Sequence, residues 1–196
     1  MTDYKVLDWA REFEYEVDIS NNELSDAYIG QNIGEDGTIF PRVPWDMYPR
    51  KFTATDDYLD PVDWHDSAVA RHSEINEGYA YVTEGLDKLL AEYGYVRNGK
   101  VYNCEQGNHD TITIVCHFGV KMVMMSHLIN VSPFALWHGT CAAPTSITEF
   151  VSEEREKGIA YFRCLRMGST PHLDMGNMEP GFTARFCETY EDNDRH

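Results

Sequence analysis

The sequence predicts a layered α/β domain, and three observations carry the prediction. The composition is that of a globular protein, 42% hydrophobic and 25% charged, and 196 residues are enough for one domain with a real core. Helical and extended patterns alternate along the chain, which is typical of α/β layers. A strand pattern also runs directly into a helix pattern over residues 111–130. We therefore expect a single domain over residues 1–196.

The pattern in the first third of the chain predicts one strand followed by a segment without long regular elements. Apolar residues alternate over residues 4–9 and charged residues follow, which predicts a strand that ends near Ala10. Residues 18–40 are polar and contain several glycines. Residues 41–66 combine four prolines with aromatic residues, so long regular elements are excluded although the segment is expected to pack. We expect residues 18–66 to form a lid or insertion.

The clearest helix is predicted over residues 75–93, where apolar side chains recur at steps of three and four residues. Ser73 is a suitable N-cap residue, and Gly94 suits the position after the last turn. Residues 95–102 predict a β-hairpin, because Asn98-Gly99 is a favoured two-residue turn.

The second half of the chain predicts further strands and helices. Residues 111–116 are rich in β-branched side chains, as in a buried strand, and an apolar helical stripe follows from Val120 to Leu128. Two more strands are expected at residues 146–152 and 159–166, and a last helix at about residues 182–190.

Charge and cysteine usage narrow the possible partners and the compartment. The net charge is −17, with only 16 Lys and Arg, so an acidic surface should repel nucleic-acid phosphates. No stretch approaches the roughly 18 apolar residues of a membrane span, and no signal peptide is visible at the start. The five cysteines are widely spaced, which favours reduced thiols and disfavours a zinc cluster. We expect a cytoplasmic protein without nucleic-acid or membrane partners.

His117 is the most informative candidate for a functional residue. It stands at the carboxyl end of the predicted strand 111–116 and directly before a helix, the place where α/β sheets bind ligands. The helix N-terminus favours an anion, and Gly119 would let the backbone approach it closely. The alternative is that His117 only ends a strand.

Two further residues are candidates for the same site. Glu12 follows a predicted strand, and a carboxyl group near a bound phosphate can act as a general acid and then as a base. Glu14 and Glu16 are rivals, and all three could form a solvated acidic edge. Arg42 could point from the lid toward an anion, although an ordinary surface arginine is the simpler interpretation. His127 falls on an apolar helical stripe and is predicted to be a packed core histidine.

Residues 110–120 resemble the second-histidine motif of the histidine-phosphatase (phosphoglycerate mutase-like) superfamily, in which a hydrophobic strand ends in His-x-Gly before a helix. Similar stretches follow in order at residues 132–139, 146–148 and 171–173. Residues 7–13 resemble the strand of that family that ends in the proton-donor glutamate. The resemblance is most specific over residues 110–173.

The resemblance implies a three-layer α/β/α domain around a mixed, mostly parallel sheet. It also implies a phosphomonoester site that needs no cofactor and no metal and works through a phosphohistidine. His117 would contact the phosphoryl group of a small phosphorylated substrate or inorganic phosphate, and Phe118 and Gly119 would lie beside it. Phe118 would offer its backbone N–H, and Glu12 would be the acid and then the base.

The sequence also departs from the family pattern. The family begins with a strand followed by Arg-His-Gly, which supplies the nucleophile, and this sequence starts with what resembles the next strand. Arg71-His72-Ser73-Glu74 is similar to that string but follows no strand, so we expect it to be accidental. The attacking imidazole, two phosphate-binding guanidiniums and the first strand are therefore expected to be missing.

Three functions follow from the resemblance and its gap. The first is a phosphomonoester hydrolase with an incomplete catalytic set. The second is a non-catalytic or truncated phosphatase-fold module that binds a phosphorylated ligand or a protein partner. The third is a homodimer that completes its sheet through an edge strand, because exposed edges tend to pair.

Overall fold

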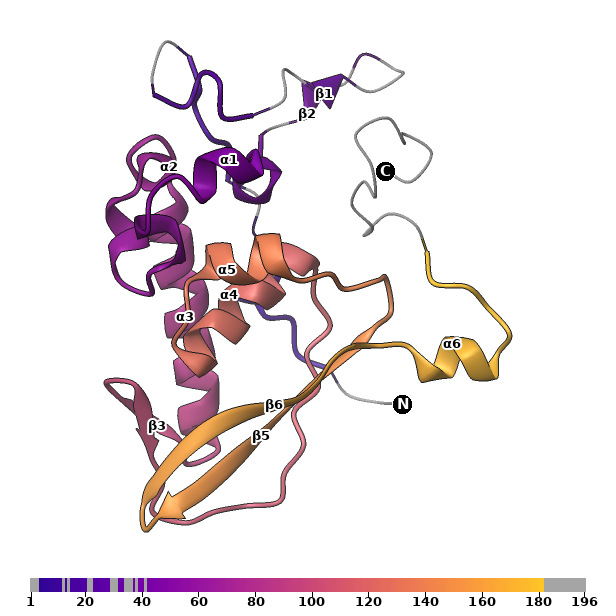
Figure 1. Ribbon diagram of the computed structural model, residues 1–196. Coiled ribbons are helices and arrows are strands. Elements are labelled where there is room, and N and C mark those ends of the chain that lie inside the picture. Colours follow the sequence, from indigo (N-terminus) through magenta and orange to yellow (C-terminus); the bar gives the residue numbers. More distant parts are fainter. Residues whose placement is uncertain are drawn as a thin grey trace.

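The computed structural model describes residues 4–181 except 12, 14, 21–22, 29–31, 34–36, 38 and 41. The chain folds into a mixed α/β structure, in which α3 and α5 pack against α4, a long β-hairpin runs along one side, and α6 stands apart beyond the end of β6 (Figure 1). The first half contains η1 (Asp8–Ala10), β1 (Asn32–Ile33), β2 (Ile39–Phe40), η2 (Pro44–Asp46), α1 (Pro49–Phe52), η3 (Asp57–Leu59), η4 (Asp63–Asp66) and α2 (Ala68–Arg71). The second half contains α3 (Ile75–Glu92), β3 (Val96–Asn98), β4 (Val101–Asn103), α4 (Phe118–Ile129), α5 (Pro133–Gly139), β5 (Ile147–Glu156), β6 (Ile159–Ser169) and α6 (Pro171–Met175).

Helix α3 confirms the longest predicted helix. Its buried residues form one face, and it ends where Gly94 takes a positive φ of 87°, which glycine adopts without strain. Ser73 is not the N-cap that the sequence predicted. The N-cap is Glu74, and the Ser73 hydroxyl donates instead to the carbonyl of Val69.

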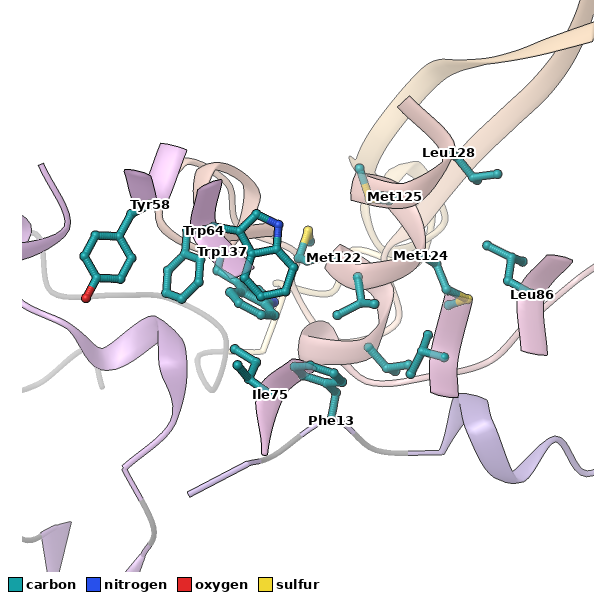
Figure 2. Close-up of a cluster of buried hydrophobic side chains, with 14 of the residues drawn as sticks. Phe13, Tyr58, Trp64, Ile75, Leu86, Met122, Met124, Met125, Leu128 and Trp137 are labelled. Carbon is teal, nitrogen blue, oxygen red and sulfur yellow. The ribbon is translucent and has the colours of Figure 1, made fainter. Parts of the chain in front are cut away.

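Helix α4 lies at the centre of the core. Its buried residues surround most of the helix, as expected for a helix covered on several sides (Figure 2). The Trp137 indole of α5 donates to the Gly119 carbonyl at 3.2 Å, and the Phe13 ring packs on the Trp137 ring with centroids 5.5 Å apart. Asn130 ends α4 in the left-handed conformation.

The four-stranded sheet has the order β3-β4-β6-β5, and every neighbouring pair is antiparallel. The predicted hairpin over residues 95–102 is confirmed as β3–β4, but its two-residue turn is Gly99-Lys100 rather than Asn98-Gly99, because Asn98 pairs with Val101. The two later strands are confirmed as well, but β5 continues to Glu156. The segment predicted as a connection is therefore mostly strand.

The expected parallel arrangement is not found in the described residues, because the strand predicted at residues 111–116 does not form. Ile114 and Cys116 pack partly against the core, whereas Val115 on the other face is 94% exposed. The alternating pattern thus gives a half-buried segment, but no described neighbour pairs with its backbone. A strand needs such a partner as well as a suitable pattern.

The N-terminal strand prediction is wrong for the same reason. Residues 4–7 form no strand, and Tyr4 and Val6 are exposed. A short 3-10 helix, η1, follows at residues 8–10. The Trp9 ring lies against Gly85 of α3, so packing on a helix replaces sheet pairing here.

The predicted lid contains only short elements, in agreement with its prolines. Within the described part of residues 18–66 these are two-residue strands, 3-10 turns and the four-residue helix α1. The helix predicted near residues 182–190 lies outside the described residues. Among the described helices, none combines the length and apolarity needed to cross a bilayer.

Candidate functional site

The N-terminus of α4 presents His117 to solvent. His117 is the N-cap residue, with extended backbone angles (φ −88°, ψ 168°), and its own side chain makes no capping hydrogen bond. Its carbonyl oxygen accepts from the Lys121 N–H at 3.1 Å, which starts the first turn. The imidazole is exposed rather than packed in the core. His117 thus stands directly before a helix and is exposed, as expected, but the strand expected ahead of it does not form.

Lys121 adds a positive charge one turn into the same helix. The Lys121 ammonium interacts electrostatically with the Cys116 and Cys141 thiols. Burial lowers the pKa of Lys121. Burial also raises the pKa of the neighbouring Cys116 thiol, which argues against a thiolate nucleophile beside His117.

Close packing explains why a glycine stands at position 119. A Cβ there would lie 2.5 Å from a Trp45 ring carbon and 2.6 Å from the Phe13 carbonyl oxygen. Trp45 also meets the Phe118 ring edge-on, with centroids 5.9 Å apart. The absence of a side chain thus lets the predicted lid and the N-terminal segment close onto the first turn of α4.

Glu12 lies outside the described residues. The next residue, Phe13, is buried and packs beside Gly119, so this part of the chain does approach the N-terminal end of α4.

Arg42 is half-buried, and its Nε atom is buried without a hydrogen-bond partner among the described residues. Its charge helps to lower the pKa of Asp18, after the larger effect of the Ser20 hydrogen bonds. Across the described ranges no hydrogen bond or ion pair joins Arg42 to His117. The structure therefore leaves Arg42 on the lid and does not bring it to the imidazole.

Arg71 and His72, the pair similar to the phosphatase nucleophile string, face a carboxylate. Arg71 Nη2 is 2.7 Å and His72 Nε2 is 3.5 Å from Glu23 Oε1. The His72 carbonyl also accepts from the Asp18 N–H at 2.9 Å. These contacts tie α2 to residues 18–23, a role in holding the fold.

The comparisons with known proteins are negative. No family model, curated protein or solved structure matches this chain. In the described part of the chain, no group of three or more His, Cys, Asp or Glu side chains is placed to hold a metal ion. The assignment of a site therefore depends on geometry and residue chemistry.

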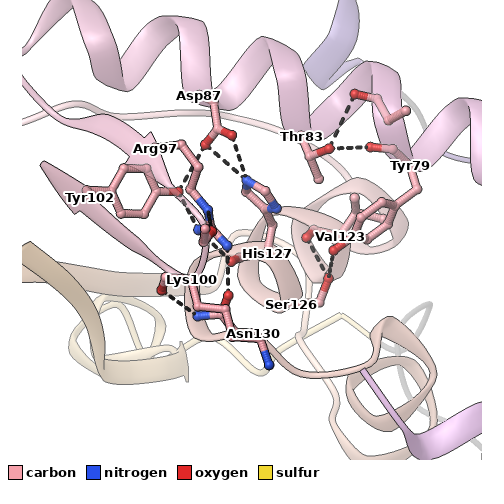
Figure 3. Close-up of polar contacts among 12 residues, drawn as sticks. Tyr79, Thr83, Asp87, Arg97, Lys100, Tyr102, Val123, Ser126, His127 and Asn130 are labelled. Atoms are coloured by element: carbon pink, nitrogen blue, oxygen red, sulfur yellow. Dashed lines mark hydrogen bonds and ion pairs between the residues drawn. The ribbon is translucent and has the colours of Figure 1, made fainter. Parts of the chain in front are cut away.

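A second polar cluster lies at the opposite end of α4 (Figure 3). His127 Nε2 is 3.0 Å from both carboxylate oxygens of Asp87 on α3. The Tyr102 hydroxyl of β4 also donates to Asp87, at 3.0 Å. His127 is mostly buried, as predicted, but its ring is hydrogen-bonded to Asp87 rather than simply packed. No local pattern in the sequence indicates this pair, because its members are 40 residues apart on different helices.

The cluster borders a small cavity of about 190 Å³. It is lined by Pro61, Val62, Tyr79, Arg97, Lys100, Ser126, His127, Asn130 and Val131. Drug-sized ligands occupy pockets of roughly 300–1,000 Å³. The cavity therefore suits only a small molecule.

Proposed function

We propose that this chain is a phosphate-binding module of the histidine-phosphatase type that does not complete phosphomonoester hydrolysis by itself. The observation that carries the proposal is the exposed His117 imidazole at the N-terminus of α4, inside the stretch that resembles the second-histidine motif.

The chemistry of this helix end suits a phosphoryl group. N–H groups in the first turn of a helix have no intrahelical acceptor, and the dipole adds positive potential there. Phe118 begins that first turn, and Trp45 and Phe13 cover Gly119, so a phosphate would meet the helix dipole and the His117 side chain. His117 can donate to a phosphate oxygen, and Lys121 adds charge to a protein whose net charge is −17.

Binding without turnover is the better-supported form of the proposal. The 196 residues contain no Arg-His-Gly string, and the similar Arg71-His72 pair is held by Glu23. The three-layer, mostly parallel sheet belongs to the same proposal and requires a further strand beside residues 111–116. Hydrolysis, with Glu12 as the acid, would need a nucleophilic histidine in addition.

Thermal unfolding with inorganic phosphate tests the binding. Binding to the folded state raises stability by about 2.7 kcal/mol when the ligand reaches 100 times its Kd. We expect phosphate to raise the Tm of the wild type and of His109→Ala, an exposed histidine outside the helix. His117→Ala should lose most of the shift. An equal shift in all three proteins would place phosphate elsewhere.

Hydrolysis of an aryl phosphate separates the two forms of the proposal. We expect the wild type and His117→Ala to show the same background rate. A wild-type rate that His117→Ala abolishes would contradict binding without turnover and favour a complete hydrolase.

A further inference from the structure

We infer that the cavity at the C-terminal end of α4 binds a small organic carboxylate. The inference is independent of the proposed phosphate site. A helix of 12 residues is about 18 Å long at 1.5 Å per residue, so the two sites are well separated.

The lining carries positive charge without a carboxylate. Three of its nine residues are basic, namely Arg97, Lys100 and His127, and none is Asp or Glu. The whole chain has 33 acidic and 16 Lys or Arg residues, so this lining runs against the overall charge. Asp87 and Asp60 lie behind this lining, against His127 and Lys100, so the groups that face the cavity itself are basic or neutral.

Arg97 is held rigidly and keeps one donor unused. Its Nε donates to the Gly99 carbonyl, Nη1 to the Tyr102 hydroxyl and the His127 carbonyl, and Nη2 to Asn130 Oδ1. These bonds account for four of the five N–H groups of a guanidinium. The fifth, on Nη2, has no acceptor among the described residues. An anion in the cavity would meet a donor that is already oriented, which lowers the entropic cost of binding.

His127 is oriented in the same way. Asp87 fixes the Nε2 edge of the ring, and Nδ1 has no hydrogen-bond partner in the described part of the chain. A neutral ring next to a carboxylate carries its proton on Nε2, and a protonated ring also has a donor at Nδ1. A protonated ring can donate from Nδ1 to a bound carboxylate.

Lys100 supplies a flexible charge at the rim. It lies in the β3–β4 turn and is exposed, and its backbone carbonyl accepts from Asn130 Nδ2 at 3.0 Å. Nearby Asp60 accepts the backbone N–H groups of Val62 and Asp63, at 2.7 and 3.0 Å, and the Lys100 charge helps to lower the pKa of Asp60 after the larger effect of these hydrogen bonds. No hydrogen bond or ion pair within the described residues fixes the Lys100 ammonium, so a ligand carboxylate can compete for it.

The apolar part of the lining favours an organic anion over an inorganic anion that has no carbon chain. Pro61, Val62 and Val131 contribute carbon surface opposite the basic groups. Inorganic phosphate would leave that surface unused, whereas a short carbon chain would cover it. The volume of about 190 Å³ limits the ligand to a short-chain carboxylate.

Titration with butyrate, followed by NMR of the His127 ring and the Val131 methyl groups, tests the inference. We expect saturable shifts in the wild type and about tenfold weaker binding in Lys100→Gln, the loss of one charge-assisted hydrogen bond. Lys88→Gln removes an exposed lysine on α3 outside the cavity and should bind as the wild type does. His117→Ala should also bind normally, which separates this site from the phosphate site.

Several outcomes would overturn the inference. They are the absence of saturable shifts, equal affinity of Lys100→Gln and the wild type, and equal affinity for butylamine or butanol, which lack the carboxylate. Inorganic phosphate that shifts the same resonances with the same affinity as butyrate would also overturn it, because the apolar lining would then contribute nothing.

Discussion

His138 carries a buried ring nitrogen without a described hydrogen-bond partner. Its Nδ1 is 2.9 Å from the Phe134 carbonyl, but Nε2 is buried and unpaired. The ring lies between two phenyl groups, with centroids 4.0 Å from Phe52 and 5.9 Å from Phe134. Burial lowers the pKa of His138 below the ordinary 6.5. The folded state therefore favours the neutral ring.

This shift makes stability depend on pH. Below pH 6.5 the unfolded chain binds a proton at His138 that the folded chain does not, so stability falls until the folded pKa is reached. We expect His138→Phe to remove this loss, which is at most about 1.4 kcal/mol per pH unit. At pH 7 the change should stay below about 1.5 kcal/mol, because the ring volume is similar.

Urea unfolding of the two proteins between pH 7 and pH 5 measures the difference. His109→Gln, which changes an exposed histidine, should follow the wild-type pH dependence. Parallel curves for the wild type and His138→Phe would show that His138 takes up its proton equally in both states.

At the scale of elements, two glycines of α3 receive the N-terminal segment. A Cβ at Gly78 would lie 2.1 Å from Tyr15 ring atoms, and one at Gly85 would lie 2.3 Å from the Trp9 ring. The two positions are seven residues apart and share one helix face. This face holds residues 9–15 against the helix although no strand forms there.

The sign of the change in unfolding free energy on Gly85→Ala tests this contact. Helix propensity alone predicts a gain of about 1 kcal/mol for alanine in a helix interior. The contact with Trp9 predicts a loss, because an overpacked site costs about 1–3 kcal/mol. We expect a net loss of unfolding free energy, measured in urea.

Removal of the clashing ring provides the matched control. In a Trp9→Ala background, Gly85→Ala should stabilise the protein, since the propensity gain then stands alone. Stabilisation of the wild type by Gly85→Ala would mean that Trp9 does not pack on α3.

At the scale of the whole molecule, the net charge of −17 opposes folding through self-repulsion. Most of the described ion pairs lie at the surface, where each contributes little. Between 0.01 and 0.15 M salt the Debye length falls from about 30 to about 8 Å. Repulsion spread over the surface is screened in that range.

We therefore expect the Tm to rise with sodium chloride over that range. A gain of 1 kcal/mol corresponds to about 2–4 °C for a chain of this size. Choline chloride should give the same rise, because screening does not depend on the cation. A falling Tm would mean that attractive surface pairs outweigh the repulsion.

The local pattern was enough to predict the elements whose partners are close in sequence. The helices at residues 75–92 and 118–129, the hairpin at Gly99 and the long strands β5 and β6 are all confirmed. Periodic apolar side chains and turn residues act within a few residues, and a single sequence displays them. The exposed position of His117 before a helix could be predicted for the same reason.

The sequence by itself determined where the two long helices and the hairpin turn form, and which helix begins directly after an exposed histidine. Only the tertiary structure decided that residues 111–116 lack a described strand partner, that the sheet is antiparallel, and that Asp87 meets His127 across 40 residues. The physical reason is that a β-ladder and an ion pair each need two groups that are distant in the chain. A local pattern shows that a residue is suited to such a contact, but it does not say which partner the folded chain brings to it.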